Sequence, residues 1–171
     1  MADPAVVGCH DAVHELAQHL DARRKLQQEV QARLAHSPRK ELMLFVHGFN
    51  ETFATAAFTT ADLCHYLGRE PVCAFFTWPA SSTGNFLISY TSTTESADYA
   101  RNHLKKVIRA LATTPGLERM QLLAHSRGSA LLLSAIRELF AEVIAAGHEP
   151  VEMLEIDNIV LFSPDIDVEV T

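Results

Sequence analysis

Short apolar runs alternate with longer segments of helical periodicity along the chain. Residues 42–46 form a run without any polar residue, which predicts a strand buried on both faces of a sheet. Three further runs, at residues 72–77, 120–124 and 156–162, predict three more strands. The pattern therefore indicates a sheet of at least four strands.

The segments between these runs carry apolar residues three or four positions apart, which predicts helices. The predicted helices are residues 11–36, 52–67, 94–112 and 129–146. Asp11 is the expected N-cap of the first helix. Residues 80–92 are rich in Ser, Thr, Gly and Asn and are expected to form a loop.

Strands that alternate with helices form parallel sheets covered by helices on both sides. We therefore predict a three-layer α/β/α sandwich with a mostly parallel sheet. Residues 1–40 are interpreted as an N-terminal amphipathic helix region, and residues 41–171 as the core.

The overall charge and hydropathy exclude several classes of protein. The 171 residues carry a net charge of −7, which argues against nucleic acid as a partner. No apolar run approaches the roughly 18 residues of a membrane span. Neither a G-x-G-x-x-G nor a Walker lysine motif follows the first strand, so no cofactor is expected.

The three cysteines, Cys9, Cys64 and Cys73, show no C-x-x-C spacing. This indicates neither a disulfide framework nor a zinc site, and it favours free thiols in a cytoplasmic protein. Residues 5–9 are similar to a lipoprotein cleavage site, but the acidic N-terminus and the short apolar stretch argue against a lipid anchor on Cys9. His10, His14 and His19 are expected on a solvated helix face rather than at a metal.

The segment Ala124-His125-Ser126-Arg127-Gly128 joins a predicted strand to a predicted helix. It matches the nucleophile elbow, G-x-S-x-G, with Ala at the first small position. Small residues are needed because the backbone makes a sharp turn that projects the serine hydroxyl. The strand and helix that flank the segment favour Ser126 as a nucleophile over an ordinary turn. The Arg127 N–H, at the positive end of the helix dipole, would stabilise an oxyanion.

Two other strand ends carry candidate groups, and the carboxyl ends of parallel strands share one edge. In His47-Gly48-Phe49, the Phe49 N–H is the candidate second oxyanion donor; the alternative is a turn with a packed histidine. Asp165 is the candidate triad acid, or else it caps a helix or closes a turn. Neither His47 nor His125 is expected to be the base, and His125 is expected to pack under the sheet.

The chain resembles a largely uncharacterised bacterial α/β-hydrolase family related to serine esterases and lipases. The resemblance covers roughly residues 41–168 and rests on motifs in the same order and at similar spacing. These motifs are Phe45-Val46-His47-Gly48-Phe49-Asn50, Thr52-Phe53, Phe76-Thr77-Trp78-Pro79-Ala80, Tyr90 with Thr94-Glu95-Ser96-Ala97, Ala124-His125-Ser126-Arg127-Gly128 and Phe162-Ser163-Pro164-Asp165-Ile166-Asp167.

The chain departs from this family at two positions and in its histidines. Arg127 stands where the family usually has Met, which suggests an anionic substrate group, and Thr93 stands where it has Asp. Such hydrolases follow the order Ser, Asp or Glu, then His. Only His148 follows Ser126, and it precedes the fourth strand, at the expected opposite edge of the sheet.

No residue of the chain therefore matches the family's catalytic histidine. The resemblance also implies further strands that would follow Thr171. We expect a truncated serine hydrolase of carboxylic esters or related acyl substrates, possessing Ser126 but not its base. The alternative is a binding protein with a degenerate hydrolase fold. Trp78, Phe86 and Tyr90 would line an acyl pocket or pack in the core.

Overall fold

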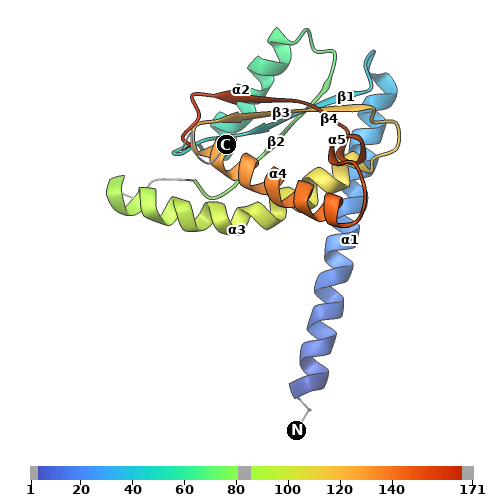
Figure 1. Cartoon of the computed structure of the whole chain (residues 1–171), viewed down its shortest axis with the longest axis vertical. Helices are drawn as coiled ribbons and strands as arrows, with labels where there is room; N and C mark the ends of the chain where they lie inside the picture. Colours follow the sequence, from blue (N-terminus) through green and yellow to red (C-terminus); the bar gives the residue numbers. More distant parts are fainter. Residues whose placement is uncertain (1–3, 81–85, 167–171) are drawn as a thin grey trace.

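The computed structural model describes the backbone of residues 4–80 and 86–166, and the side chains of residues 14–80 and 99–166. Four parallel strands form one sheet in the order β2-β1-β3-β4 (Figure 1). The strands are β1 (Glu41–Val46), β2 (Val72–Phe76), β3 (Arg119–His125) and β4 (Ile156–Phe162). The predicted strands are confirmed, with small differences at the ends.

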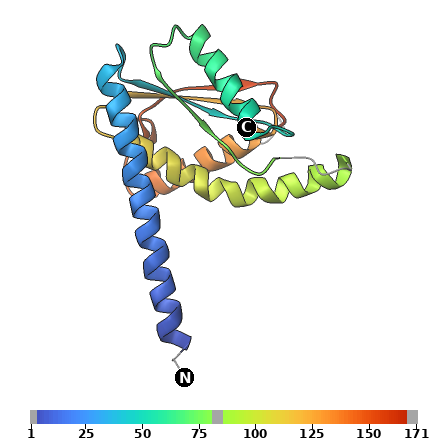
Figure 2. The same cartoon turned by 180° about the vertical axis from the view of Figure 1, so that it is seen from behind.

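Helices cover both faces of the sheet, as Figures 1 and 2 show. One face packs against α3 (Phe86–Ala112), α4 (Arg127–Ala145) and the C-terminal end of α1 (Pro4–His36). The other face carries α2 (Phe53–Tyr66), and a short helix, α5 (Pro150–Leu154), precedes β4. The predicted three-layer α/β/α sandwich is confirmed.

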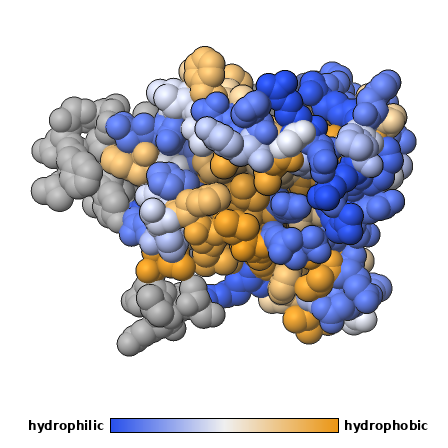
Figure 3. All heavy atoms as spheres, turned by 90° about the horizontal axis from the view of Figure 1, so that it is seen from above, coloured by the Kyte–Doolittle hydropathy of each residue, from blue (hydrophilic) through white to orange (hydrophobic). Residues whose placement is uncertain are grey.

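The face that carries α2 is only partly covered. A small cluster of Met43, Phe45 and Leu123 lies there, with Leu63 of α2 packed against it. Beyond it, on β4, Val160 remains 40% exposed and Phe162 remains 39% exposed. Figure 3 looks onto this side of the molecule and shows apolar surface in its middle.

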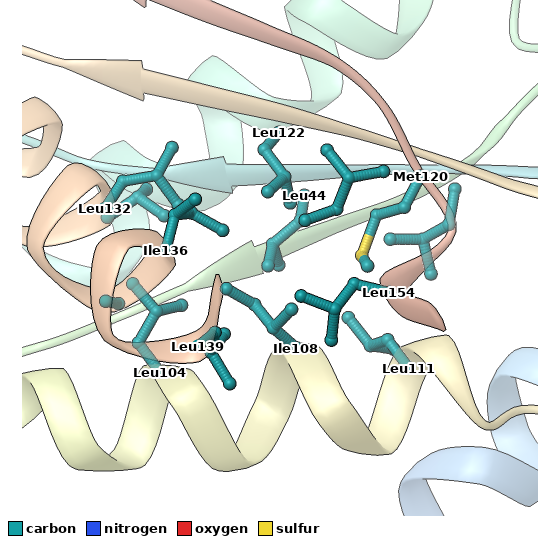
Figure 4. Close-up of a cluster of buried hydrophobic side chains, with 14 of the residues drawn as sticks. Leu44, Leu104, Ile108, Leu111, Met120, Leu122, Leu132, Ile136, Leu139 and Leu154 are labelled. Atoms are coloured by element: carbon teal, nitrogen blue, oxygen red, sulfur yellow. The ribbon is translucent and has the colours of Figure 1, made fainter. Parts of the chain in front are cut away.

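The main core lies on the opposite face, between the sheet and α3 and α4 (Figure 4). Its side chains come from alternate positions of β1 and β3 and from one stripe of each helix, as the two periodicities require. The central members are fully buried: Leu44, Leu104, Ile108, Leu122, Leu132 and Leu139. This core fixes α4, and therefore the turn that precedes it, against the sheet.

Two helices begin about two turns earlier than the sequence predicts, and α4 begins two residues earlier, at Arg127. α1 begins at Pro4, so Asp11 lies inside the helix and is not its N-cap; proline suits the first helical position because its missing N–H has no partner there. α3 begins at Phe86, so the prediction of a loop over 80–92 is wrong from that residue on. Ser and Thr disfavour a helix by only about 0.5 kcal/mol per residue, and no Gly or Pro follows Asn85 within α3. Residues 81–85 of the predicted loop lie outside the described residues.

Cys64 and Cys73 form a disulfide with an S–S distance of 2.10 Å. The prediction of free thiols is therefore wrong for this pair. α2 returns over the sheet, which brings its last turn beside β2 and places the two cysteines together despite their nine-residue separation. The Cys9 side chain lies outside the described residues.

Candidate active site

Ser126 lies at the junction of β3 and α4 with φ 50° and ψ −125°. This left-handed conformation is rarely adopted by residues other than glycine. Its N–H donates to the Phe162 carbonyl at 3.0 Å, and its carbonyl accepts from the N–H groups of Ser129 at 2.9 Å and Asp165 at 3.3 Å. The end of β4 therefore holds this sharp turn in place.

Two glycines allow the backbone to pack closely around Ser126. A Cβ on Gly128 would lie 2.4 Å from the His47 carbonyl oxygen and 2.5 Å from that of Val46. A Cβ on Gly48 would lie 3.0 Å from the Ser126 Cβ. The start of α4 thus presses against the end of β1, and the loop after β1 lies beside Ser126.

His47 is fully buried and is a packed structural residue. Its Nε2 accepts from the Trp78 backbone N–H at 3.2 Å and lies 3.2 Å from the Thr77 hydroxyl. Nδ1 therefore carries the proton and donates to the Gly48 carbonyl at 3.0 Å. Burial lowers the pKa of His47, although the Gly48 hydrogen bond and Glu51 oppose that shift. A neutral ring with both nitrogens engaged cannot serve as the base for Ser126.

Trp78 completes this arrangement from the segment after β2. Its indole N–H donates to the His47 carbonyl at 2.9 Å, and the two rings stack at 5.7 Å between centroids. Of the two interpretations of Trp78, core packing therefore applies. The sequence alone does not indicate Trp78 and Thr77 as partners of His47, because only the pairing of β1 with β2 brings them together. The side chains of Phe86 and Tyr90 lie outside the described residues.

Asp165 and Arg127 meet beside the turn. Arg127 Nη1 lies 3.5 Å from Asp165 Oδ2, with the Arg127 side chain 14% exposed and that of Asp165 44% exposed. The Asp165 backbone also closes the turn through its bond to the Ser126 carbonyl. Ser126, Arg127 and Asp165 thus lie together at the carboxyl edge of the sheet, and Phe49 follows Gly48 in the loop after β1 at the same edge.

The histidines do not complete this site within the described residues. His125 borders a cavity of about 270 Å³ between α2 and the sheet, with Phe45, Leu63 and Phe162. It is partly exposed rather than packed under the sheet as expected. His148 follows α4 and precedes β4, so it lies at the opposite edge from Ser126.

Other kinds of site find no support in the described part of the chain. Among the residues whose side chains are described, 14–80 and 99–166, no group of three His, Cys, Asp or Glu residues could hold a metal ion. His14 and His19 are exposed on α1, as expected for a solvated helix face. None of the helices, where described, is long and apolar enough to cross a bilayer.

A parallel sheet between helical layers, with a strained serine between a strand and a helix at its carboxyl edge, is typical of the α/β-hydrolase class. The family model described as alpha/beta hydrolase of unknown function (DUF900) matches residues 22–171. The chain belongs to this family, and the resemblance inferred from its motifs is confirmed. No curated protein and no solved structure matches the chain.

Proposed function

We propose that the protein is a serine hydrolase of carboxylic esters or related acyl compounds, with Ser126 as the nucleophile. The observation that carries this proposal is the backbone of Ser126, which has φ 50° at the carboxyl end of β3, beside Gly48. A strained conformation that is held by hydrogen bonds to the end of β4, to Asp165 after it and to the first turn of α4 is characteristic of functional sites.

In the proposed reaction, Ser126 Oγ attacks the acyl carbon and gives its proton to a base. The N–H groups of Phe49 and Arg127, with the N-terminal dipole of α4, stabilise the oxyanion. The proton then passes to the leaving alcohol, and water hydrolyses the acyl-enzyme by the same steps in reverse roles.

The proposal assigns the base to a histidine outside these 171 residues. His47 is fully engaged with Gly48 and Trp78, and His148 lies at the opposite edge of the sheet. Loss of a triad histidine costs about 10⁶-fold in turnover, so the base must come from further chain or from a partner. Asp165 is the candidate acid, but in the described structure its carboxylate lies beside Arg127.

The Arg127–Asp165 pair bears on substrate choice. An arginine beside the nucleophile would favour an anionic acyl substrate, and Asp165 offsets part of that charge. We expect Arg127→Met to reduce hydrolysis of acidic esters several-fold more than that of neutral esters. Equal losses on both substrates would remove the argument for an anionic substrate and leave the nucleophile in place.

The second candidate function is a non-catalytic binding protein with this fold. It is favoured by one observation: among the described residues, no histidine forms a hydrogen bond with the Ser126 hydroxyl. Such a protein would retain the turn for structural reasons alone.

Labelling with a fluorophosphonate distinguishes these functions when it is done on the protein made from its complete reading frame. The hydrolase proposal expects labelling that Ser126→Ala abolishes. Ser129→Ala is the matched control, because Ser129 is a buried serine three residues further along α4 and should not affect labelling. Absence of labelling in the folded protein, or labelling that survives Ser126→Ala, favours the binding protein.

A further inference from the structure

A cavity of about 330 Å³ lies between α1 and α3, where the two helices cross. Figures 1 and 2 show α1 passing the C-terminal half of α3 and then projecting away from the sandwich. This half of α3 leads into the amino end of β3, so the cavity is remote from Ser126 at the carboxyl edge. The volume lies at the lower end of the roughly 300–1,000 Å³ range of small-molecule pockets.

The floor of the cavity is apolar. Leu26 of α1 and Val107 of α3 line it, together with the small side chains of Ala22 and Ala110. The alanines leave space where larger residues would close the contact between the helices. Leu20 of α1 is half-exposed and extends the apolar lining toward solvent.

Every ionisable residue that lines the cavity is basic. Arg23 donates only to the neutral hydroxyl of Thr113, at 3.0 Å, and Lys106 has no carboxylate partner among the described residues. Arg109 is paired with Glu142, and two histidines, His19 and His103, complete the rim. Among the residues whose side chains are described, Arg23 and Lys106 thus lie beside an apolar floor without a carboxylate partner of their own, and a carboxylate beside the rim, Glu15, lies 3.5 Å from His19.

We propose that this cavity binds an anionic amphiphile. A carboxylate or phosphate group would lie between Arg23 and Lys106, and a short alkyl chain would cover Leu26 and Val107. Arg and Lys are the side chains that recognise such anions, and apolar lining with a few placed polar groups is the usual form of a ligand pocket. The proposal does not depend on the proposed function, because it involves neither Ser126 nor its surroundings.

Isothermal titration calorimetry with octanoate, octyl phosphate and 1-octanol tests the proposal. Both anions should bind, and the neutral alcohol should bind at least about tenfold more weakly, because it cannot pair with Arg23 or Lys106. Lys106→Glu should weaken binding of the anions roughly tenfold, since it replaces an attraction with a repulsion.

Two further variants make the result specific to the cavity. Arg24→Glu is the matched control, because Arg24 is an exposed neighbour on α1 that does not line the cavity. It should leave binding unchanged. Ala22→Phe fills the cavity from its exposed side without a change of charge and should abolish binding while thermal unfolding stays unchanged.

The same anion could come from a free amphiphile or from the headgroup of a lipid. Flotation with phosphatidylcholine vesicles, with and without phosphatidylglycerol, distinguishes these sources. Binding of octanoate without flotation indicates a free ligand, and flotation that needs both phosphatidylglycerol and Lys106 indicates a lipid. The proposal is overturned if neither anion nor vesicle binds, if 1-octanol binds as well as octanoate, or if Arg24→Glu weakens binding as much as Lys106→Glu.

Discussion

The backbone of Ser126 is strained, and the strain should be measurable as lost stability. A residue with a Cβ at φ 50° costs about 1–3 kcal/mol, whereas glycine adopts this region readily. We expect Ser126→Gly to raise the free energy of unfolding by about 1 kcal/mol in urea denaturation, with the gain limited by the greater freedom of glycine in the unfolded chain. Ser126→Ala, which keeps the Cβ, should be nearly neutral, and equal effects of both variants would contradict the interpretation.

Gly128 tests the close approach of α4 to β1. A Cβ at this position would lie 2.4 Å and 2.5 Å from two backbone carbonyl oxygens, which cannot move without a shift of β1. Gly128→Ala should therefore lower the free energy of unfolding by about 2–4 kcal/mol. Gly116→Ala is a useful comparison, since no atom lies within 4 Å of the added Cβ and only its φ of 84° opposes the change; it should cost clearly less.

His47 should make stability depend on pH. Burial lowers its pKa in the folded protein, so below about pH 6.5 the unfolded chain takes up a proton that the folded protein does not. The free energy of unfolding should therefore fall as the pH drops below about 6.5, by up to about 1.4 kcal/mol per pH unit. Above that pH, His47 should contribute no pH dependence, because the ring is neutral in both the folded and the unfolded chain. Gln at this position can still donate to Gly48 and accept from Trp78. In His47→Gln the dependence on pH should be weaker, as urea denaturation at a series of pH values would reveal; an unchanged slope would contradict the assignment.

At the scale of elements, the disulfide ties the end of α2 to β2. A crosslink that closes a loop of this length contributes about 2–3 kcal/mol by restricting the unfolded chain. Addition of a reductant should lower the urea midpoint of the wild-type protein accordingly. The double variant Cys64→Ala/Cys73→Ala should be equally destabilised without reductant, and its urea midpoint should not change when reductant is added. A wild-type urea midpoint that stays the same in reductant would contradict the crosslink.

The strands were predictable because each is a local apolar run, and β4 matches its predicted range at both ends. The early start of α3 was not predictable from the sequence. Ser and Thr disfavour a helix only weakly, and a helix can continue through them when no Gly or Pro interrupts it. Two side-chain pairs form only when the fold brings distant elements together: α2 packs beside β2 at Cys64–Cys73, and the segment after β4 lies beside the start of α4 at Arg127–Asp165. The spacing of these residues along the chain does not predict either contact. The turn at Ser126 was predictable from its local motif, whereas the partners of His47 were not.

At the scale of the whole molecule, the partly covered sheet face should drive self-association. Val160 and Phe162 are about two-fifths exposed beside the cluster of Phe45 and Leu123, and contiguous apolar surface of this kind favours contacts between molecules. We expect the 171-residue protein to associate with increasing concentration in sedimentation velocity, and Val160→Lys to shift it toward monomer.

Ile144→Lys provides the control for this prediction. Ile144 is 62% exposed on the outer side of α4, away from the sheet face, so its substitution removes apolar surface elsewhere. A wild-type protein that stays monomeric at all concentrations, or an equal effect of both lysine variants, would show that this face does not drive association.

The stacking of Trp78 on His47 has a practical consequence. Trp78 is the only tryptophan of the chain, so its ultraviolet fluorescence originates at one place, next to the loop that borders Ser126. Emission from the unlabelled protein therefore provides an optical reporter of that loop. Spectral shifts during a titration with a candidate acyl compound would record rearrangement there directly, without an attached dye.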